Sequence, residues 1–312
     1  MNIDQKVNIL IIGGDSYIAK NFIYKFSDCF NIRIISRKIT GYWNELIIED
    51  FNNIPEIEFR KKNVVINFAA IVHINENKII KKNYYDINVS LAIKNANQSK
   101  HAGVYQFVQI STIAVYGDVE KININSRENP KTIYAKSKLI ADKEILNLNS
   151  TSFKVAIVRP PMVYGGGNTP GNMMRLITLV SSGIPLPFRG FENKRNFINV
   201  NNLIQYIAII VEKELDGIYL VSDNVPVSTE YIIHVISKHL QKEIKTFKIP
   251  QFALDLLKFI RPKIYNKLYR ALEISTNFPF EYSIQNHSVD EGILEMVDWY
   301  HKERFAGRSS FL

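Results

Sequence analysis

Val7-Asn8-Ile9-Leu10-Ile11-Ile12-Gly13-Gly14-Asp15-Ser16-Tyr17-Ile18-Ala19 is the stretch of this 312-residue chain from which its architecture can be predicted. The first six residues are mostly apolar, as is typical of a strand buried on both faces of a sheet. Two glycines follow, and apolar residues then recur at helical spacing through Ile18, Phe22 and Phe26. The stretch therefore predicts a buried strand, a tight turn and a helix in direct succession.

Further apolar runs follow along the first half of the chain and alternate with helical patterns. Strands are predicted near 32–35, 46–48, 64–68, 105–110 and 154–158, and helices near 84–96 and 134–148. This alternation, with strands that are apolar throughout, is typical of a parallel sheet covered by helices on both faces. We therefore predict an α/β fold, a Rossmann-type doubly wound parallel sheet with a smaller C-terminal substrate-binding lobe.

The character of the sequence changes after Pro161, where glycines and prolines become frequent. Loops of this composition can cover a ligand. We predict a nucleotide-binding domain over residues 1–160 and a mainly substrate-binding lobe over 161–312, from which about 193–210 returns to the first domain.

Two late segments carry separate predictions. Residues 242–247 are predicted to form a strand. Residues 252–269 are basic and amphipathic, which fits a lid helix, a membrane-surface helix or a packed helix with a solvated basic face. Of these three we expect the packed helix.

Composition narrows the class of partner and the compartment. The formal net charge is +9, but the lysines are dispersed, so we predict an anionic small substrate and no nucleic acid. The single cysteine, Cys29, fits a reducing compartment. We find no secretory signal in residues 1–6 and no apolar run of about 20 residues that would span a bilayer. We predict a cytoplasmic protein without an integral membrane segment and without a metal site.

The glycine turn predicts a binding site for a dinucleotide. Backbone N–H groups at the start of a helix that follows a strand hold the pyrophosphate. The usual G-x-x-G-x-x-G spacing is modified here to Gly13, Ser16 and Ala19, which are all small. The predicted cofactor contacts in this turn are Gly13, Ser16, Tyr17 and Ile18.

The residues after the second strand bear on the choice of cofactor. An acidic residue at this position would bind the ribose 2′-hydroxyl of NAD, but the chain has Ser36 and Arg37. A guanidinium suits a 2′-phosphate, so we predict NADP(H) as the preferred cofactor and keep NAD(H) open. Arg37 and Lys38 could instead be solvent-exposed residues at the end of the strand without a role in cofactor binding. Asp50 is a candidate to bind the adenine amino group.

A tyrosine and a lysine stand four residues apart in the helix predicted at 134–148. Tyr134 and Lys138 would lie on one face, one turn apart. A neighbouring ammonium favours the phenolate, so we expect a lowered pKa for Tyr134. Such a phenol can act as an acid or base on a sugar or alcohol oxygen. Thr112 precedes this pair by 22 residues.

These features together resemble one family over nearly the whole chain, the extended short-chain dehydrogenase/reductases. The family includes nucleotide-sugar epimerases, dehydratases and ketoreductases. Besides the glycine turn and the Tyr134/Lys138 pair, the matching motifs are Asn67-Phe68-Ala69-Ala70, Asn88, Ser111-Thr112-Ile113-Ala114-Val115-Tyr116-Gly117, Arg159-Pro160-Pro161-Met162-Val163-Tyr164-Gly165 and Arg195-Asn196-Phe197-Ile198-Asn199-Val200.

The resemblance implies roles for individual residues. Thr112 would hydrogen-bond the reacting sugar oxygen, Tyr134 would exchange a proton with it, and Lys138 would hold the nicotinamide ribose. Arg195 would pair with a substrate diphosphate, and Asn172 would lie near the diphosphate or nucleoside. Each of these residues could instead be a structural polar group. The resemblance further implies Ser111 as a substrate contact and Phe68, Ala69, Ala70, Asn88, Lys138 and Pro161 as cofactor contacts.

Departures from family motifs bear on the reaction. Dehydratases carry an Asp-Glu pair after the catalytic threonine, where this chain has Ile113 and Ala114. Typical 4-epimerases carry an asparagine where this chain has Met162. We therefore predict an NADP(H)-dependent enzyme that reduces the C4 ketone of a UDP-4-keto-6-deoxy-N-acetylhexosamine in surface polysaccharide biosynthesis. The alternative is a UDP-sugar 4-epimerase with bound NAD.

Two further implications of the resemblance remain open. A non-catalytic NADP-binding regulator could share this fold, although such proteins usually lose the Tyr/Lys pair that this chain retains. Many members of the family dimerise through a four-helix interface that would include the Tyr134 helix, so a homodimer is an option for this chain.

Overall fold

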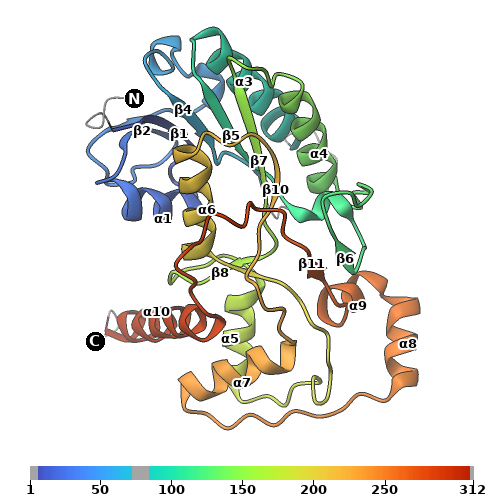
Figure 1. Ribbon diagram of the computed structural model, residues 1–312. Coiled ribbons are helices and arrows are strands. Elements are labelled where there is room, and N and C mark those ends of the chain that lie inside the picture. The colour runs from blue at the N-terminus through green and yellow to red at the C-terminus, as the bar shows by residue number, and fades with distance from the viewer. Residues whose placement is uncertain (1–5, 72–83, 310–312) are drawn as a thin grey trace.

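A seven-stranded sheet, in the order β10-β7-β5-β4-β1-β2-β3, forms the centre of the computed structural model, which describes residues 6–71 and 84–309. All neighbouring strands in it run parallel (Figure 1). The strands are β1 (Asn8–Ile12), β2 (Asn31–Ser36), β3 (Glu45–Ile47), β4 (Val64–Asn67), β5 (Gln106–Ile110), β7 (Lys154–Arg159) and β10 (Gly217–Leu220).

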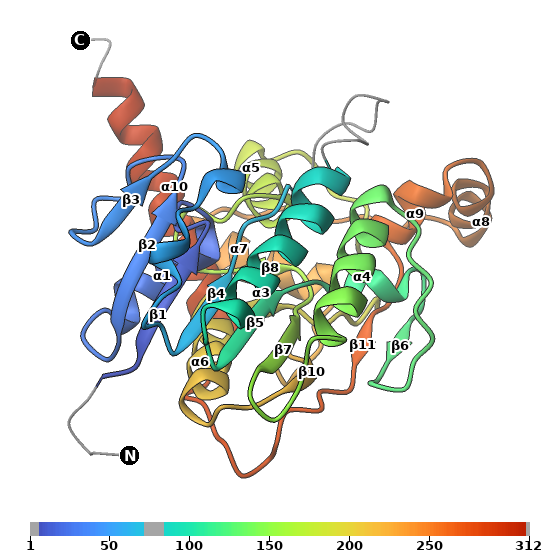
Figure 2. The same ribbon diagram turned by 90° about the horizontal axis from the view of Figure 1, so that it is seen from above.

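Helices cover both faces of this sheet, and the side chains of β1 alternate between two cores. Ile9 and Ile11 pack toward α1 (Tyr17–Phe26) and α6 (Val200–Glu212). Leu10 and Ile12 pack on the other face, toward α3 (Ala92–His101) and α4 (Ile133–Leu146). Figure 2 shows the sheet between these two pairs of helices. The predicted doubly wound parallel fold is confirmed.

Shorter elements connect the main ones. A π-helix (Asp86–Leu91) leads into α3, and 3₁₀ turns occupy Phe51–Asn53, Glu56–Glu58 and Ile113–Tyr116. Two small parallel sheets lie outside the central one. They pair β6 (Lys121–Ile122) with β11 (Glu273–Ile274) and β8 (Val163–Tyr164) with β9 (Ile198–Asn199).

Most of the chain after β8 packs around a separate core, in the lower part of Figure 1. Its helices are α5 (Asn172–Ser182), α7 (Thr229–Leu240), α8 (Gln251–Ile260), α9 (Pro262–Leu268) and α10 (Val289–Ser309). Between them, α6 and β10 return to the central sheet. The division into two lobes at 160/161 stays a prediction.

Two sequence predictions for this part of the chain are wrong. Residues 242–247 form no strand. Their pairing is limited to one isolated parallel bridge between Thr246 and Leu186. Residues 252–269 form two helices rather than one. Pro262 lacks an N–H and disfavours helical backbone at Arg261, whose φ of −134° and ψ of 62° separate α8 from α9.

Within residues 6–71 and 84–309, no helix is long and apolar enough to cross a membrane. The prediction that no secretory signal is present rests mostly on residues 1–5, which lie outside the described part. The cytoplasmic location and the homodimer stay predictions.

Candidate active site

The turn after β1 has the shape that a pyrophosphate cradle requires. Gly13 has a φ of +84°, and a Cβ there would lie 2.7 Å from the backbone nitrogen of Ala69. Only glycine fits so close to the neighbouring strand exit in this conformation. Ser16 caps α1 by accepting a hydrogen bond from the N–H of Ala19 at 3.3 Å. A bare glycine turn at the N-terminus of a helix fits a dinucleotide.

Tyr17 links this turn to the loop after β8. Its hydroxyl donates to the carbonyl of Gly165 and lies 2.9 Å from the hydroxyl of Thr169. Ile18 is partly buried against the core beside α1. Both side chains therefore have structural neighbours, and their predicted cofactor contacts stay predictions.

The end of β2 places a cation beside an aromatic ring. Ser36 is buried and donates to the carbonyl of Lys38 at 2.9 Å. Arg37 is exposed, and its guanidinium lies 5.6 Å from the centre of the Phe51 ring. Asp50 caps the following turn, with its carboxylate 2.9 Å from the N–H of Asn52. Arg37 is therefore exposed beside Phe51 and the carboxylate of Asp50 has a local partner, and the predicted cofactor contacts of Ser36, Arg37 and Asp50 stay predictions.

The segment after β4 is fastened to α4 through a buried asparagine. Asn88 accepts from the N–H of Ile71 at 2.8 Å and donates to the hydroxyl of Ser137 at 3.1 Å. Ser137 in turn donates to the carbonyl of Tyr134 at 2.8 Å. Asn88 thus aligns the β4 exit with the helix of the Tyr/Lys pair. Of the other predicted cofactor contacts, Phe68, Ala69 and Pro161 are buried and Ala70 is partly buried.

The structure brings Thr112, Tyr134 and Lys138 together. Thr112 follows β5 and caps the 3₁₀ turn, accepting from the N–H of Ala114 at 3.2 Å. A side-chain hydrogen bond joins it to Tyr134. Lys138, one turn further along α4, is only 1% exposed. A hydroxyl, a phenol and a buried amine at the carboxyl ends of parallel strands can bind an alcohol oxygen and move its proton.

The expected lowering of the tyrosine pKa is wrong for this structure. Burial raises the pKa of Tyr134, and the negative charge of Asp142 raises it further against the opposing hydrogen bond from Thr112. Burial also lowers the pKa of Lys138 to about 8, despite the opposing influence of Asp142. Desolvation therefore outweighs the attraction between charges that sequence spacing suggested.

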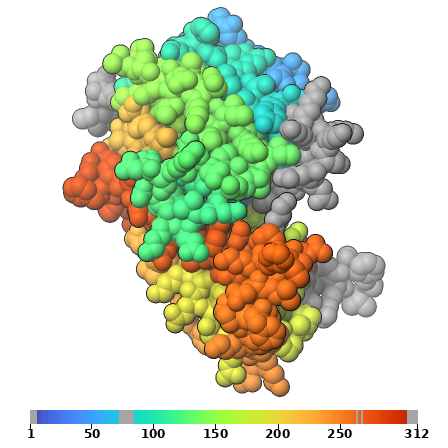
Figure 3. All heavy atoms as spheres, turned by 90° about the vertical axis from the view of Figure 1, so that its right-hand side faces the viewer, coloured from blue at the N-terminus to red at the C-terminus, as the bar shows by residue number. Residues whose placement is uncertain are grey.

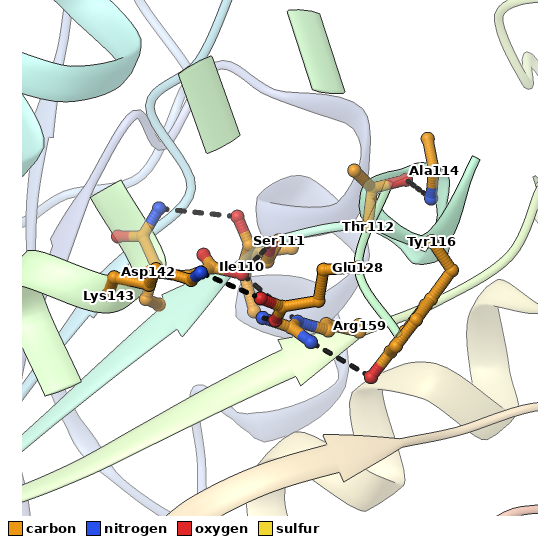
Figure 4. A network of polar contacts seen from close by, with 10 residues as sticks. Ile110, Ser111, Thr112, Ala114, Tyr116, Glu128, Asp142, Lys143 and Arg159 are labelled. Atoms are coloured by element: carbon orange, nitrogen blue, oxygen red, sulfur yellow. Dashed lines mark hydrogen bonds and ion pairs between the residues drawn. The ribbon is translucent and has the colours of Figure 1, made fainter. Parts of the chain in front are cut away.

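A buried ionic network beneath the pair was not predicted (Figure 4). Asp142 is the next residue along the same face of α4, one turn beyond Lys138. Its carboxylate accepts from Ser111 at 2.6 Å and from Nε of Arg159, at the end of β7, at 3.0 Å. The same guanidinium donates to Tyr116 and Glu128, each at 2.8 Å. The hydroxyl of Ser111 is thus used inside the protein, and its substrate contact stays a prediction.

Arg195 lies beside a second arginine that sequence reasoning missed. Its segment is bridged to Val227 and to Leu272, which brings Arg270 close. Burial and the charge of Arg270 lower the pKa of Arg195 to about 10. Two neighbouring guanidinium groups, one largely desolvated, suit a ligand with two negative charges. Asn172, also in the lower lobe, is the first residue of α5.

The burial of Lys138 predicts opposite effects on stability and on activity. Lys138→Met is expected to lower kcat at least about 10²-fold, because the amine beside the reacting phenol is lost. At pH 7 it is expected to raise the free energy of unfolding, because the folded protein no longer buries an ammonium whose pKa is lowered to about 8. Urea unfolding and steady-state kinetics on the same preparation measure both.

The pH dependence of stability provides the control. Between about pH 8 and 10 the unfolded wild-type chain binds a proton at Lys138, with its ordinary pKa of 10.5, that the folded protein has released. Wild-type stability should therefore rise with pH across this window, and Lys138→Met should lack that rise. A variant that is less stable than wild type at pH 7 would contradict the prediction.

The sheet, the glycine turn and the Thr/Tyr/Lys cluster together form the arrangement expected of a dinucleotide-dependent enzyme of the short-chain dehydrogenase/reductase type. The model of the NAD dependent epimerase/dehydratase family matches residues 9–221. The chain belongs to this family, which confirms the prediction that it is an enzyme.

Named relatives agree with the family assignment. The chain is 28% identical to a UDP-glucose 4-epimerase of Vibrio cholerae, over 86% of this chain and 87% of that protein. It is 21% identical to the N-acetyl-α-D-glucosaminyl-diphospho-ditrans,octacis-undecaprenol 4-epimerase of Escherichia coli O157:H7, over 83% and 82% of the two chains. The UDP-glucuronic acid 4-epimerase of Bacillus cereus, solved with NAD, matches the fold with a TM-score of 0.77 at 17% identity, over 95% and 97%.

The comparisons therefore support the predicted enzyme class but not the predicted 4-ketoreductase activity. The chain belongs to the NAD dependent epimerase/dehydratase family, and the relatives are named as enzymes that act on nucleotide sugars. The names of these relatives describe 4-epimerases, which was the alternative prediction, rather than the 4-ketoreductase that the motifs favoured.

Proposed function

We propose that this enzyme is a 4-epimerase of a sugar carried on a diphosphate, with a UDP-hexose or UDP-N-acetylhexosamine as its substrate. The observation that carries the proposal is the joining of Thr112 to Tyr134 beside the buried Lys138. The names of the Vibrio cholerae and Bacillus cereus proteins support the choice of C4 and of UDP.

Each residue of the cluster has a part in this reaction. Tyr134 would act as the phenolate, which takes the proton from the 4-hydroxyl and later returns it, and Thr112 would hold the same oxygen. Lys138 would hold the ribose of the cofactor, and its positive charge would stabilise the phenolate of Tyr134 once the site is filled. Gly13, Ser16 and the N-terminus of α1 would hold the dinucleotide, whose nicotinamide supplies the hydride acceptor and donor.

The arginine pair would recognise the diphosphate. Arg195 and Arg270 present two cations, and Asp118 accepts from Arg270 at 2.7 Å and so orients it. This recognition does not depend on what lies beyond the diphosphate. A nucleoside and a polyprenol, the group named for the Escherichia coli relative, would both leave these contacts intact.

Removing the second arginine should weaken substrate binding more than turnover. Arg270→Gln is expected to raise the Kd for UDP by about 10–100-fold, because charge-assisted hydrogen bonds to the diphosphate are lost. Titration calorimetry with UDP measures it, and Arg60→Gln, an exposed arginine outside the site, is the matched control. Equal affinity for UDP in Arg270→Gln and wild type would contradict the assignment.

The reaction itself is tested with the purified enzyme and its own cofactor. We expect interconversion of UDP-glucose with UDP-galactose, or of their N-acetyl forms, by NMR without added nucleotide. The cofactor released on denaturation should be NAD, present in nearly stoichiometric amount. An enzyme that leaves all four sugars unchanged while holding NAD would refute the proposed function.

A 4-ketoreductase of surface polysaccharide biosynthesis is the second candidate, because one observation favours it. Ser36 replaces the acidic residue that binds the ribose of NAD, and Arg37 lies over Phe51 beside it. Such an enzyme would oxidise NADPH in the presence of a UDP-4-keto-6-deoxy-N-acetylhexosamine. Exchangeable NADP(H) in place of tightly held NAD would favour this candidate.

The role of Arg37 can be measured for either candidate. Arg37→Ala is expected to weaken NADP⁺ binding by about 10-fold or more and NAD⁺ binding by about 3-fold or less, because only NADP⁺ offers it a phosphate. Fluorescence titration of both cofactors gives the ratio, and Lys38→Ala is the control. An equal loss for both cofactors would show that Arg37 does not read the 2′-phosphate.

A further inference from the structure

An apolar stripe lies exposed on α8 and continues onto α9. Phe252 is 73% exposed and Phe259 is 84% exposed. Leu256 and Ile260 lie between and beside them at helical spacing, so the four side chains share one face of α8. Ile264 and Leu268 of α9 are also exposed. The exposed apolar face is a feature that the sequence prediction of a packed helix with a solvated basic face did not include.

The stripe is not the face by which α8 joins its lobe. Leu254, on the other side of the helix, is buried in the core of the lower lobe, and Leu257 packs against that core. A surface helix ordinarily places polar residues opposite such a face. Here a second apolar face turns outward. Contiguous exposed apolar side chains of this kind mark a binding surface.

The charge of the same segment indicates what binds there. Residues 251–270 contain five basic residues and one acidic residue, Asp255, which gives a net charge of +4. Arg261 is exposed and directly follows Ile260 of the stripe, whereas Lys258 lies on the side of α8 that carries Leu254, over the ring of Tyr265. An exposed apolar face in a segment of net positive charge is the pattern of helices that lie in the interface of an anionic membrane.

The position of the segment connects it with the candidate site. The chain after α9 passes through Tyr269, whose ring packs on Phe191 with centroids 4.9 Å apart. The next residue is Arg270, the neighbour of Arg195. Figure 3 shows α8, in orange, exposed on the face of the lower lobe. The stripe therefore lies near the arginine pair in the chain.

We propose that α8 and α9 form a docking face for an anionic phospholipid bilayer, into whose interface Phe252, Leu256 and Phe259 insert. Arg261, which follows the stripe, then contacts the lipid headgroups. Docking of this kind needs no spanning helix and brings the Arg195–Arg270 pair toward the headgroup layer. It does not depend on which sugar the enzyme converts.

Sedimentation of the full chain with vesicles tests the proposal. We expect binding to vesicles of phosphatidylcholine with phosphatidylglycerol, weaker binding to phosphatidylcholine alone, and weakening of the former at high salt. Phe252→Ser/Phe259→Ser is expected to lower the partition coefficient by about 10-fold or more. Arg261→Gln should reduce only the part that depends on phosphatidylglycerol.

A matched control and a folding check accompany these variants. Phe280 is 97% exposed but lies in the loop between β11 and α10, outside the stripe. Phe280→Ser should therefore bind vesicles as wild type does. Cofactor binding and thermal unfolding establish that the variants are folded. Absence of vesicle binding by wild type, or unchanged binding by the double variant, would overturn the proposal. A dimer in analytical ultracentrifugation that dissociates in the double variant, without vesicle binding by wild type, would instead assign the stripe to a second copy of the chain.

Discussion

Tyr134→Phe is expected to lower kcat by about 10³-fold, because the substitution removes the oxygen that accepts the proton of the 4-hydroxyl and returns it. The phenyl ring keeps its place beside Tyr84, whose ring centre lies 6.3 Å away. Cofactor content, substrate affinity and the melting temperature should therefore change little. Rapid-quench or NMR assays with saturating substrate measure the loss of kcat, and ultrafiltration measures the bound cofactor.

Tyr84→Phe is the matched control for this prediction. It removes a phenolic hydroxyl from the same neighbourhood but leaves Thr112 and Tyr134 joined. Activity within about 3-fold of wild type is expected, since no proton transfer is lost. A Tyr134→Phe enzyme with full biological activity would contradict the catalytic assignment and revive the non-catalytic regulator as an explanation.

The sequence allowed the fold and the centre of the site to be predicted because both depend on local patterns. The apolar run of β1, the turn at Gly13 and the spacing of Tyr134 and Lys138 each lie within one strand, one turn or one helix. Their arrangement follows from the parallel order of the strands. Thr112 could be added because the motif around it resembles that of the family.

The parts that escaped prediction depend on contacts between distant segments. Arg270 joins Arg195 only because the chain from α9 returns beside it, and nothing in its neighbouring residues marks it. Asp142 offered one signal, its position one turn beyond Lys138, but its partner Arg159 comes from another strand. The pKa of Tyr134 was predicted in the wrong direction because burial cannot be read from spacing alone.

Those distant contacts also make Arg159 the residue whose loss should cost the most stability. Arg159→Met is expected to lower the free energy of unfolding by about 3 kcal/mol, because it leaves Asp142 charged and buried without its guanidinium partner. The side chains of both residues are almost fully buried, so solvent screens the interaction little. Urea unfolding at neutral pH, followed by circular dichroism, measures the change.

Two comparisons isolate the ionic contribution of Arg159 from simple loss of packing. Glu128→Gln removes a more exposed partner of the same arginine and should cost about 1 kcal/mol or less. Arg159→Met/Asp142→Asn no longer contains the orphaned carboxylate. It should therefore be destabilised by less than the sum of the two single variants, which a double-mutant cycle detects.

The pH dependence of stability distinguishes loss of the charge of Arg159 from a packing defect, because a packing defect would not change with pH. Burial already raises the pKa of Asp142 above its ordinary 3.8, and loss of Arg159 should raise it further. The folded variant then holds a proton that the unfolded chain releases, so its stability falls as the pH rises above about 4. The difference between Arg159→Met and wild type should accordingly shrink as the pH is lowered toward 4. If that difference stays constant with pH, Arg159 stabilises the fold through its volume and not through its charge.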